Sequence, residues 1–174
     1  KNKIKYLEHL LSSSKKKSFV PGVKIVRGAY MEKERSRAKK LSYEDPICMN
    51  KIETDRNFNG ALKFLVKNLN YFSFIMGTHN EESSSLLMDL MIKNKIQSNN
   101  KHIWFAQLYG MSDQISFNIA NLGYNVCKLL PYGPVKEVLP YLIRRAEENS
   151  SIRGQSSREL ALIKKEFKRR KINS

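Results

Sequence analysis

Val23-Lys-Ile-Val-Arg-Gly-Ala-Tyr30 is a short β-prone run that ends in a cation and a glycine. Its first four residues are mostly branched and apolar, as in a strand. Beyond them, Gly28 would let a ligand approach the main chain closely, and the fixed charge of Arg27 suits a phosphate or a ring acceptor. A simple turn with a solvated arginine is the alternative, and the residues alone leave both interpretations open.

A strand followed by a helix recurs along the chain. Further strands are expected over residues 71–76, 102–107 and 125–130, and Trp104 and Phe105 are expected in the core. Helices are expected over residues 3–12, 32–40, 54–69, 81–95, 112–122, 141–148 and 157–171, with irregular segments at 12–17 and 41–53. This alternation predicts parallel strands with right-handed helical crossovers. Four strand–helix units are half of an eight-unit α/β barrel.

Several residues mark the expected helix ends. Thr54 and Asp55 can cap the helix that follows them, and Asn80 can cap the helix over residues 81–95. Gly123 suits the position just past a helix. Pro140 is expected in the first turn of the helix that carries residues 141–148.

The chain is strongly basic, with 32 Lys and Arg against 16 Asp and Glu and a formal net charge of +16. A nucleic-acid surface, an anionic membrane and a lysine-rich solvated exterior each explain such a charge. The solvated exterior is favoured, because the basic clusters at residues 15–17, 39–40 and 164–171 do not form one recognisable nucleic-acid module. No apolar run has the length needed to span a bilayer, and no secretory signal opens the chain.

The cysteines and histidines do not predict a metal site or a hydrolase. Cys48 and Cys127 do not resemble a disulfide framework, which favours a reducing compartment. His9, His79 and His102 have no ligand spacing with each other or with the cysteines. The sequence also lacks a Gly-x-Ser-x-Gly elbow, a Walker lysine pattern and a Gly-x-Gly-x-x-Gly fingerprint.

Polar residues gather where the expected strands end. Thr78, His79 and Asn80 follow the second strand, Gln107 ends the third, and Tyr132 follows the fourth. The carboxyl ends of parallel strands are where α/β barrels and open α/β sheets bind ligands. A histidine in this position can contact a phosphate or a ring, although a lone histidine is also commonly structural.

A pair of arginines lies in Tyr132-Gly-Pro-Val-Lys-Glu-Val-Leu-Pro-Tyr-Leu-Ile-Arg-Arg-Ala-Glu-Glu-Asn149. Tyr141, Arg144, Arg145 and Glu148 are three or four residues apart, which gathers them on one side of a helix. Adjacent guanidiniums suit the capture of a small carboxylate. A solvated Arg/Glu face is the alternative, because surface charge pairs are common and weak.

Together these motifs resemble the proline dehydrogenase family. The resemblance lies in residues 23–35, 78–80, 105–117 and 131–149, runs from about residue 21 to the end, and is closer to the single-function enzymes than to the fused bifunctional proteins. It implies an α/β fold, the C-terminal half of a proline-dehydrogenase-like (β/α)8 TIM barrel with about four βα units plus a C-terminal helix. Residues 1–20 would precede the βα units of residues 21–150, and residues 151–174 would form the basic C-terminal helix.

The resemblance also implies a reaction. It is the FAD-dependent oxidation of L-proline to Δ1-pyrroline-5-carboxylate by hydride transfer to flavin N5, the first step of proline catabolism to glutamate, with electrons passed to a quinone. L-proline and the quinone are the expected partners, and no nucleic acid is expected. The expected location is the cytoplasm of a bacterium, with peripheral contact at the inner membrane, or the mitochondrion of a eukaryote. The sequence does not indicate an oligomeric state.

The resemblance assigns roles to individual residues. Cofactor contacts are expected from Arg27, Gly28, Ala29, Thr78, His79, Asn80 and Gln107. The catalytic candidates are Lys24 and Tyr30. The expected substrate contacts are Arg144, Arg145, Tyr141, Leu108, Leu129 and Glu148, with the two arginines on the carboxylate.

Two positions depart from the family pattern. Lys24 replaces an arginine that many members hold over the flavin, which keeps the charge but loses the planar fork. Leu129 replaces a tyrosine that commonly packs against the proline ring, so strict selection against ring-substituted analogues is in doubt. A basic nucleic-acid-binding module and an inactive half-barrel with unpaired strand edges near Val23 and Val126 remain as alternatives.

Overall fold

The computed structural model describes residues 1–27, 30–151 and 155–172, and it describes only the backbone of residues 144–151, 155–159, 163, 166 and 172. The chain divides into two units, Lys1–Leu129 and Leu130–Ser174. The first unit contains a sheet with its helices, and the second contains the helices α6 (Val135–Ser151) and α7 (Gln155–Ile172).

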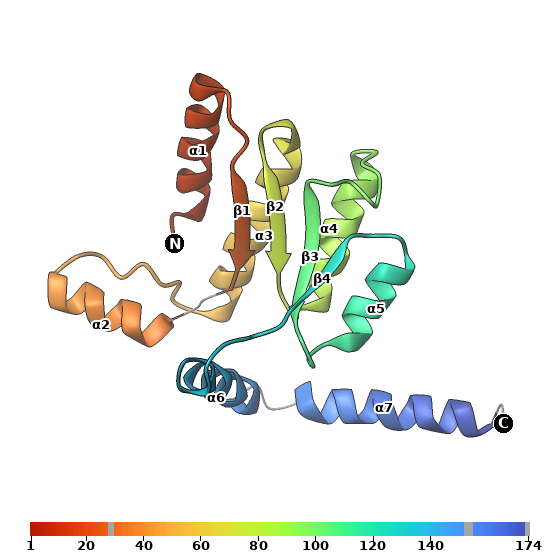
Figure 1. Cartoon of the computed structure of the whole chain (residues 1–174). Coiled ribbons are helices and arrows are strands. Elements are labelled where there is room, and N and C mark those ends of the chain that lie inside the picture. The colour runs from red at the N-terminus through yellow and green to blue at the C-terminus, as the bar shows by residue number, and fades with distance from the viewer. Residues whose placement is uncertain (28–29, 152–154, 173–174) are drawn as a thin grey trace. The chain divides into compact units, whose positions relative to one another are not determined.

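A parallel sheet forms the centre of the first unit. Its strands are β1 (Gly22–Val26), β2 (Ser73–Gly77), β3 (Ile103–Leu108) and β4 (Val126–Leu129). They lie side by side in chain order, and every neighbouring pair is parallel (Figure 1). The predicted α/β class with four parallel strands is confirmed. The unbroken order is that of a barrel segment, because doubly wound sheets reverse direction at a switch point.

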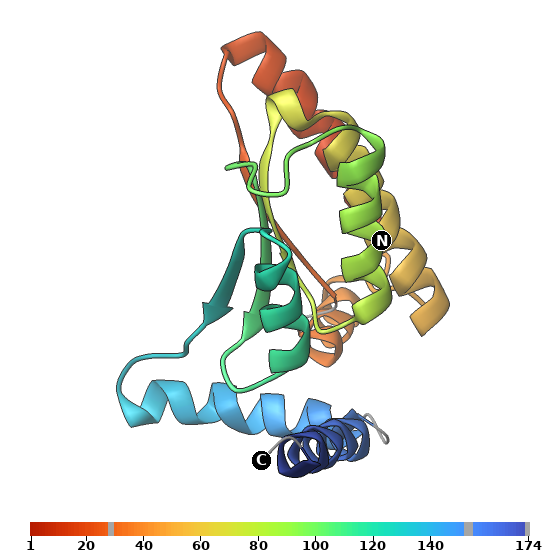
Figure 2. The same cartoon turned by 90° about the vertical axis from the view of Figure 1, so that its right-hand side faces the viewer.

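Helices cover one face of this sheet. The helical elements of the first unit are α1 (Lys3–Lys17), α2 (Met31–Leu41), α3 (Lys51–Lys67), η1 (Leu69–Tyr71), α4 (Glu81–Lys93) and α5 (Asp113–Asn121). Figure 2 shows α3, α4 and α5 on the same side of the strands. The core lies between them and the sheet, and it includes Phe58, Leu62, Leu65, Phe74, Met76, Leu87, Met91, Ile103 and Phe105.

The alternation of side chains along each strand decides which residues enter the core. Ile103 and Phe105 of β3 point towards the helices and are fully buried. Trp104 lies between them, so it points to the other face and is 37% exposed. The prediction that Trp104 belongs to the core is therefore wrong, whereas that for Phe105 is confirmed.

Two helices of the first unit differ from the predicted boundaries. α1 continues to Lys17 through the predicted loop, because Ser14 lies seven residues, about two helical turns, beyond Leu7 on the packed side and both are buried. α3 begins at Lys51, inside the segment expected to be irregular. Its N-cap is Asn50, whose side chain accepts from the main-chain N of Glu53 at 2.9 Å.

Two further boundary predictions are corrected. The N-cap expected at Thr54 and Asp55 is wrong, because both residues lie inside α3. Pro140 lies inside α6 rather than in its first turn. That helix starts earlier, with the carbonyl of Pro134 accepting from the main-chain N of Val138 at 3.1 Å, so the proline removes one later hydrogen bond without ending the helix.

Truncating the core side chain Leu62 is expected to destabilise the first unit strongly. Leu62 is fully buried, and Leu62→Ala would remove its contacts and leave a cavity, which lowers the free energy of unfolding by about 2–5 kcal/mol. The matched control is Leu122→Ala, because Leu122 is 62% exposed, and it should change this free energy by about 0.5 kcal/mol or less. Urea unfolding followed by circular dichroism measures both, and equal losses would contradict the described core.

Candidate functional site

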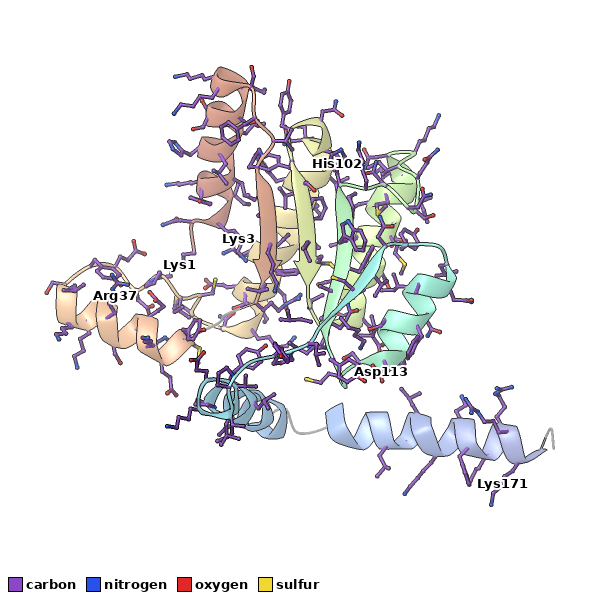
Figure 3. All side chains as sticks on the ribbon, viewed as in Figure 1. Lys1, Lys3, Arg37, His102, Asp113 and Lys171 are labelled. Carbon is purple, nitrogen blue, oxygen red and sulfur yellow. The ribbon has the colours of Figure 1, made fainter. Side chains whose placement is uncertain are left out.

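The carboxyl ends of the four strands lie at one edge of the sheet, because all the strands are parallel. Arg27, Thr78 and Tyr109 directly follow β1, β2 and β3. In Figure 3, His102 lies at the opposite end of β3, whereas Asp113 lies at the end where β3 finishes. His102 is therefore not part of the candidate site, and His79 is the histidine beside the strand ends.

Arg27 is held by three hydrogen bonds and an aromatic ring. Its Nε donates to Asp55 Oδ1 at 2.7 Å, its Nη1 to Thr78 Oγ1 at 2.6 Å, and its Nη2 to Ser83 Oγ at 2.5 Å. The guanidinium carbon lies 4.0 Å from the centre of the Phe58 ring, a cation–π contact. Arg27 thus ties the end of β1 to α3, to the β2–α4 turn and to α4. The alternative of a solvated arginine in a simple turn is wrong.

Asp55 is a functional candidate that the sequence did not reveal. It pairs with Lys51 at 2.8 Å as well as with Arg27. Partial burial would raise the pKa of the Asp55 carboxyl, but hydrogen bonds from Lys51 and Arg27 outweigh burial and leave this pKa below its ordinary value. Asp55 therefore carries its charge at neutral pH and balances that of the guanidinium.

Thr78 and Asn80 form a tight turn at the end of β2. The Thr78 hydroxyl accepts from the main-chain N of Asn80 at 3.2 Å, which is the bond of an ST-turn. The Asn80 side chain accepts from the main-chain N of Ser83 at 2.8 Å, so Asn80 is the N-cap of α4 as predicted. The same two residues thus end β2 and start the helix.

Gln107 has a hydrogen-bond partner for its amide nitrogen and another for its amide oxygen. It is 2% exposed, and its Nε2 donates to the main-chain O of Thr78 at 3.2 Å. Its Oε1 accepts from Ser116 Oγ at 2.9 Å, a partner on α5 that the sequence analysis missed. The expected need for partners is met, and Gln107 supports the Thr78 turn from β3.

His79 lies beside α5. Its Nδ1 is 2.9 Å from Ser112 Oγ, and its other ring nitrogen makes no hydrogen bond with the residues that the structure describes. Burial, and to a smaller extent the positive charge of Lys128, hold the pKa of His79 below its ordinary value. The imidazole is therefore neutral at neutral pH and can offer its second nitrogen to a ligand.

Lys128 holds the β3–α5 loop from β4. Its Nζ donates to the main-chain O of Met111 at 2.6 Å and forms an ion pair with Asp113 at 2.7 Å. This role could not be predicted from local patterns, because Lys128 stands in an apolar run and its partners come from an earlier segment of the chain. Its charge is balanced by Asp113, as that of Arg27 is balanced by Asp55.

Lys24 lies on the sheet face away from the helices. It is exposed, and its register partner on β2 is Ile75, whereas Gly77 is the partner of Val26. A Cβ added to Gly77 would lie 3.6 Å from Lys24 Cε and 3.0 Å from Val26 Cγ1. The contact with Val26 is the tight one, so the absence of a side chain at Gly77 makes room for Val26, and Lys24 lies at ordinary van der Waals distance.

The structure describes the positions of some of the remaining predicted site residues, and others lie outside its described part. Tyr30 is 56% exposed and is the N-cap residue of α2. Leu108 and Leu129 are register partners on β3 and β4, and Leu129 is 43% exposed. Gly28 and Ala29 lie outside the described residues. Tyr141, Arg144, Arg145 and Glu148 lie on α6 in the second unit, and the side chains of the last three are outside the described part.

Metal-ligating residues do not gather in the described part of the chain, where no group of three or more His, Cys, Asp or Glu side chains could hold an ion. Cys48 and Cys127 are both free. None of the described helices has the length and apolar character needed to cross a bilayer.

A family model described as proline dehydrogenase matches residues 1–158 of the chain. The chain belongs to the proline dehydrogenase family. The match begins at residue 1, before residue 21 where the resemblance was expected to begin, and it ends within α7. It therefore includes every strand and the helix α6 with its arginine pair.

Two relatives show how much of a proline dehydrogenase the chain represents. It is 44% identical over 165 residues to proline dehydrogenase 1, mitochondrial, of Dictyostelium discoideum, an alignment that covers 92% of this chain and 29% of that protein. It is 41% identical over 156 residues to hydroxyproline dehydrogenase of Xenopus laevis, covering 87% of this chain and 34% of that protein. The chain thus spans well under half the length of these relatives.

The fold is also similar to a solved structure. Proline utilization A from Bdellovibrio bacteriovorus, in a crystal structure of the protein inactivated by N-propargylglycine, matches with a TM-score of 0.80 and 27% sequence identity. The match covers 88% of this chain and 16% of that one. The predicted fold, part of a proline-dehydrogenase-like α/β barrel, is confirmed.

The lowered pKa of His79 predicts a loss of stability in mild acid. Unfolding returns this pKa to about 6.5, so below that pH the unfolded chain binds more protons than the folded one. The contribution of His79 is therefore complete above about pH 6.5 and falls towards the folded pKa, by at most about 1.4 kcal/mol per pH unit.

Urea unfolding of wild type and His79→Gln between pH 7.5 and pH 5 measures this contribution. The wild type should lose more stability than the variant over this range. The matched variant His102→Gln leaves His79 in place, so it should still lose more stability than His79→Gln. Equal pH profiles for His79→Gln and wild type would contradict the lowered pKa.

Proposed function

We propose that the protein containing this chain oxidises L-proline to Δ1-pyrroline-5-carboxylate with FAD as its cofactor. The observation that carries the proposal is the hydrogen-bonded group of Arg27, Thr78 and Gln107 at neighbouring strand ends of a proline dehydrogenase fold. Rigid polar groups at this edge of an α/β barrel are suited to ligand binding. The charge of +16 alone suggested a nucleic-acid module, and the family membership favours the enzyme.

The polar groups at the strand ends fit a flavin nucleotide. A guanidinium has five N–H donors, and only three of those of Arg27 bind described side chains. His79 keeps one ring nitrogen available. A flavin nucleotide offers acceptors at its ring carbonyls and its pyrophosphate, which the remaining guanidinium donors match, and the second nitrogen of His79 can donate or accept according to the tautomer of the ring. The bound flavin would accept a hydride at N5.

The residues of the chain would divide the work of holding cofactor and substrate. Arg27, Thr78, His79 and Gln107 would bind or support the flavin, with the segment of Gly28 and Ala29, and Asn80 would fix the turn. Lys24 would place a positive charge on the exposed sheet face, with Tyr30 as the second catalytic candidate. Arg144 and Arg145 would bind the carboxylate of proline, and Tyr141, Leu108, Leu129 and Glu148 would surround the ring.

Electron transfer to a quinone is the second part of the proposal. A quinone acceptor would give the basic surface a use at anionic lipid, where each lysine or arginine near the surface contributes about 1 kcal/mol. For a eukaryotic source the proposed location is the mitochondrion, as in the name of the Dictyostelium relative. For a bacterial source it is the cytoplasm, with contact at the inner membrane.

Hydroxyproline is a second candidate substrate. Leu129 supplies no hydroxyl at the position where the family commonly has tyrosine, and one relative is named hydroxyproline dehydrogenase. Comparing kcat/KM for L-proline and for trans-4-hydroxy-L-proline in the full-length protein decides which substrate is preferred. A preference above tenfold for proline would exclude hydroxyproline as the main substrate.

The visible spectrum of the full-length protein tests the proposed reaction. An oxidised flavin should give the protein a yellow colour, and anaerobic addition of L-proline should bleach it, because the hydride passes to the flavin. D-proline is the control for non-specific reduction. A protein without flavin, or one whose spectrum L-proline does not change, would contradict the proposal.

Removing one arginine of the pair should weaken substrate binding. Arg145→Ala in the full-length protein is expected to reduce the affinity for a proline-like carboxylate by about 2–5 kcal/mol, because it leaves a buried carboxylate without its partner. Spectral titration of the flavin measures the dissociation constant. Arg56→Ala is the matched control, since Arg56 is exposed on α3, and an unchanged constant for Arg145→Ala would exclude the assigned role.

A further inference from the structure

The hydroxyl of Thr78 has both of its acceptor positions filled. Its oxygen accepts from Arg27 Nη1 at 2.6 Å and from the main-chain N of Asn80 at 3.2 Å. A threonine hydroxyl has two acceptor lone pairs and one O–H donor, so only the donor is left. No acceptor among the described residues takes this hydrogen. Thr78 is 7% exposed, and a buried donor of this kind requires a partner.

Arg27 makes the Thr78 hydroxyl an acceptor towards the protein, because a guanidinium donates hydrogen bonds and accepts none. A neighbour able to accept, such as an amide, would let the Thr78 hydroxyl turn inwards and donate within the protein. A ligand group that meets Thr78 must therefore be an acceptor, such as a carbonyl oxygen, a phosphate oxygen or an unprotonated ring nitrogen.

The orientation of Arg27 depends on two side chains outside the predicted site. Asp55 accepts from Nε at 2.7 Å and balances the charge of the guanidinium. Ser83 accepts from Nη2 at 2.5 Å and in turn donates to Asn59 Oδ1 at 2.7 Å. Because these bonds fix two of the three nitrogens, the third can point only at Thr78.

We propose that Asp55 is a positioning residue of the cofactor site, which acts through Arg27 to leave the Thr78 hydroxyl able only to donate to an acceptor atom of the flavin nucleotide. This proposal rests on the proposed function, because it requires a flavin nucleotide at Thr78. It adds α3 to the elements that build the site, whereas the sequence placed the cofactor contacts only at the strand ends.

A double-mutant cycle on the full-length protein tests the coupling. The flavin is removed, and the dissociation constant of added FAD is measured by quenching of flavin fluorescence for Asp55→Ala, Thr78→Val and the double variant. Thr78→Val should raise the constant about tenfold by removing the donor, and Asp55→Ala about three- to tenfold. In the Thr78→Val background Asp55→Ala should add less than about twofold, since its effect passes through the hydroxyl.

Two further variants control for folding and for charge. Asp89→Ala removes an exposed carboxylate from α4 and should leave the FAD dissociation constant within about twofold of wild type. Arg27→Lys keeps the charge but cannot reach three acceptors at once, so the part of its effect that passes through the hydroxyl should disappear in the Thr78→Val background, whereas the part from its own proposed contact with the flavin should remain. Thermal unfolding shows which variants are folded. If Asp55→Ala does not fold, the result for Arg27→Lys decides the test.

The outcomes separate the two proposals. A wild-type protein that binds FAD and is bleached by L-proline, with effects of Asp55→Ala and Thr78→Val that multiply fully, overturns the positioning role alone. A wild-type protein that binds no FAD overturns the proposed function and the positioning role with it. Coupled effects in a protein that binds FAD support both.

Discussion

The guanidinium of Arg27 is the interaction on which the edge of the sheet depends. It joins β1 to α3 through Asp55, to the β2–α4 turn through Thr78 and to α4 through Ser83, and it lies over the Phe58 ring. Charged hydrogen bonds of this kind are short and directional. Because the ion pair is partly buried, removing one partner would leave the other charge poorly compensated. The site is thus built from neighbouring strand–helix segments of the first unit and not from one loop.

The two faces of the sheet differ in burial, because one packs against the helices and the other is exposed. The face towards the helices carries the core, and near the strand ends it also carries Gln107, whose amide nitrogen and oxygen each have a hydrogen-bond partner. The other face carries exposed residues, including Lys24, Trp104 and Leu129. In a barrel this second face is the interior. In a complete barrel the exposed Lys24 would therefore face the interior.

Much of the fold could be predicted because its signals are local. Apolar runs, turns and helix caps placed all four strands, and Asn80 was correctly assigned as the cap of α4. The wrong predictions concern residues whose structure depends on a partner far away in the sequence. The helix α1 continues because its last turns pack on the rest of the unit, and Asp55 turns from α3 towards Arg27 instead of capping the helix. Trp104 lies outside the core because strand alternation outweighs its hydrophobicity.

The sequence by itself determined the family, the parallel α/β fold and the identity of Arg27, Thr78, His79 and Gln107 as residues at strand ends. These follow from local patterns, since a strand, a turn and a motif can each be recognised from a few adjacent residues. Only the tertiary structure decided that the guanidinium of Arg27 meets Asp55 and Ser83, and that Gln107 meets Ser116. The reason is that a hydrogen bond needs two atoms about 3 Å apart, and only the folded backbone brings residues far apart in the chain to that distance.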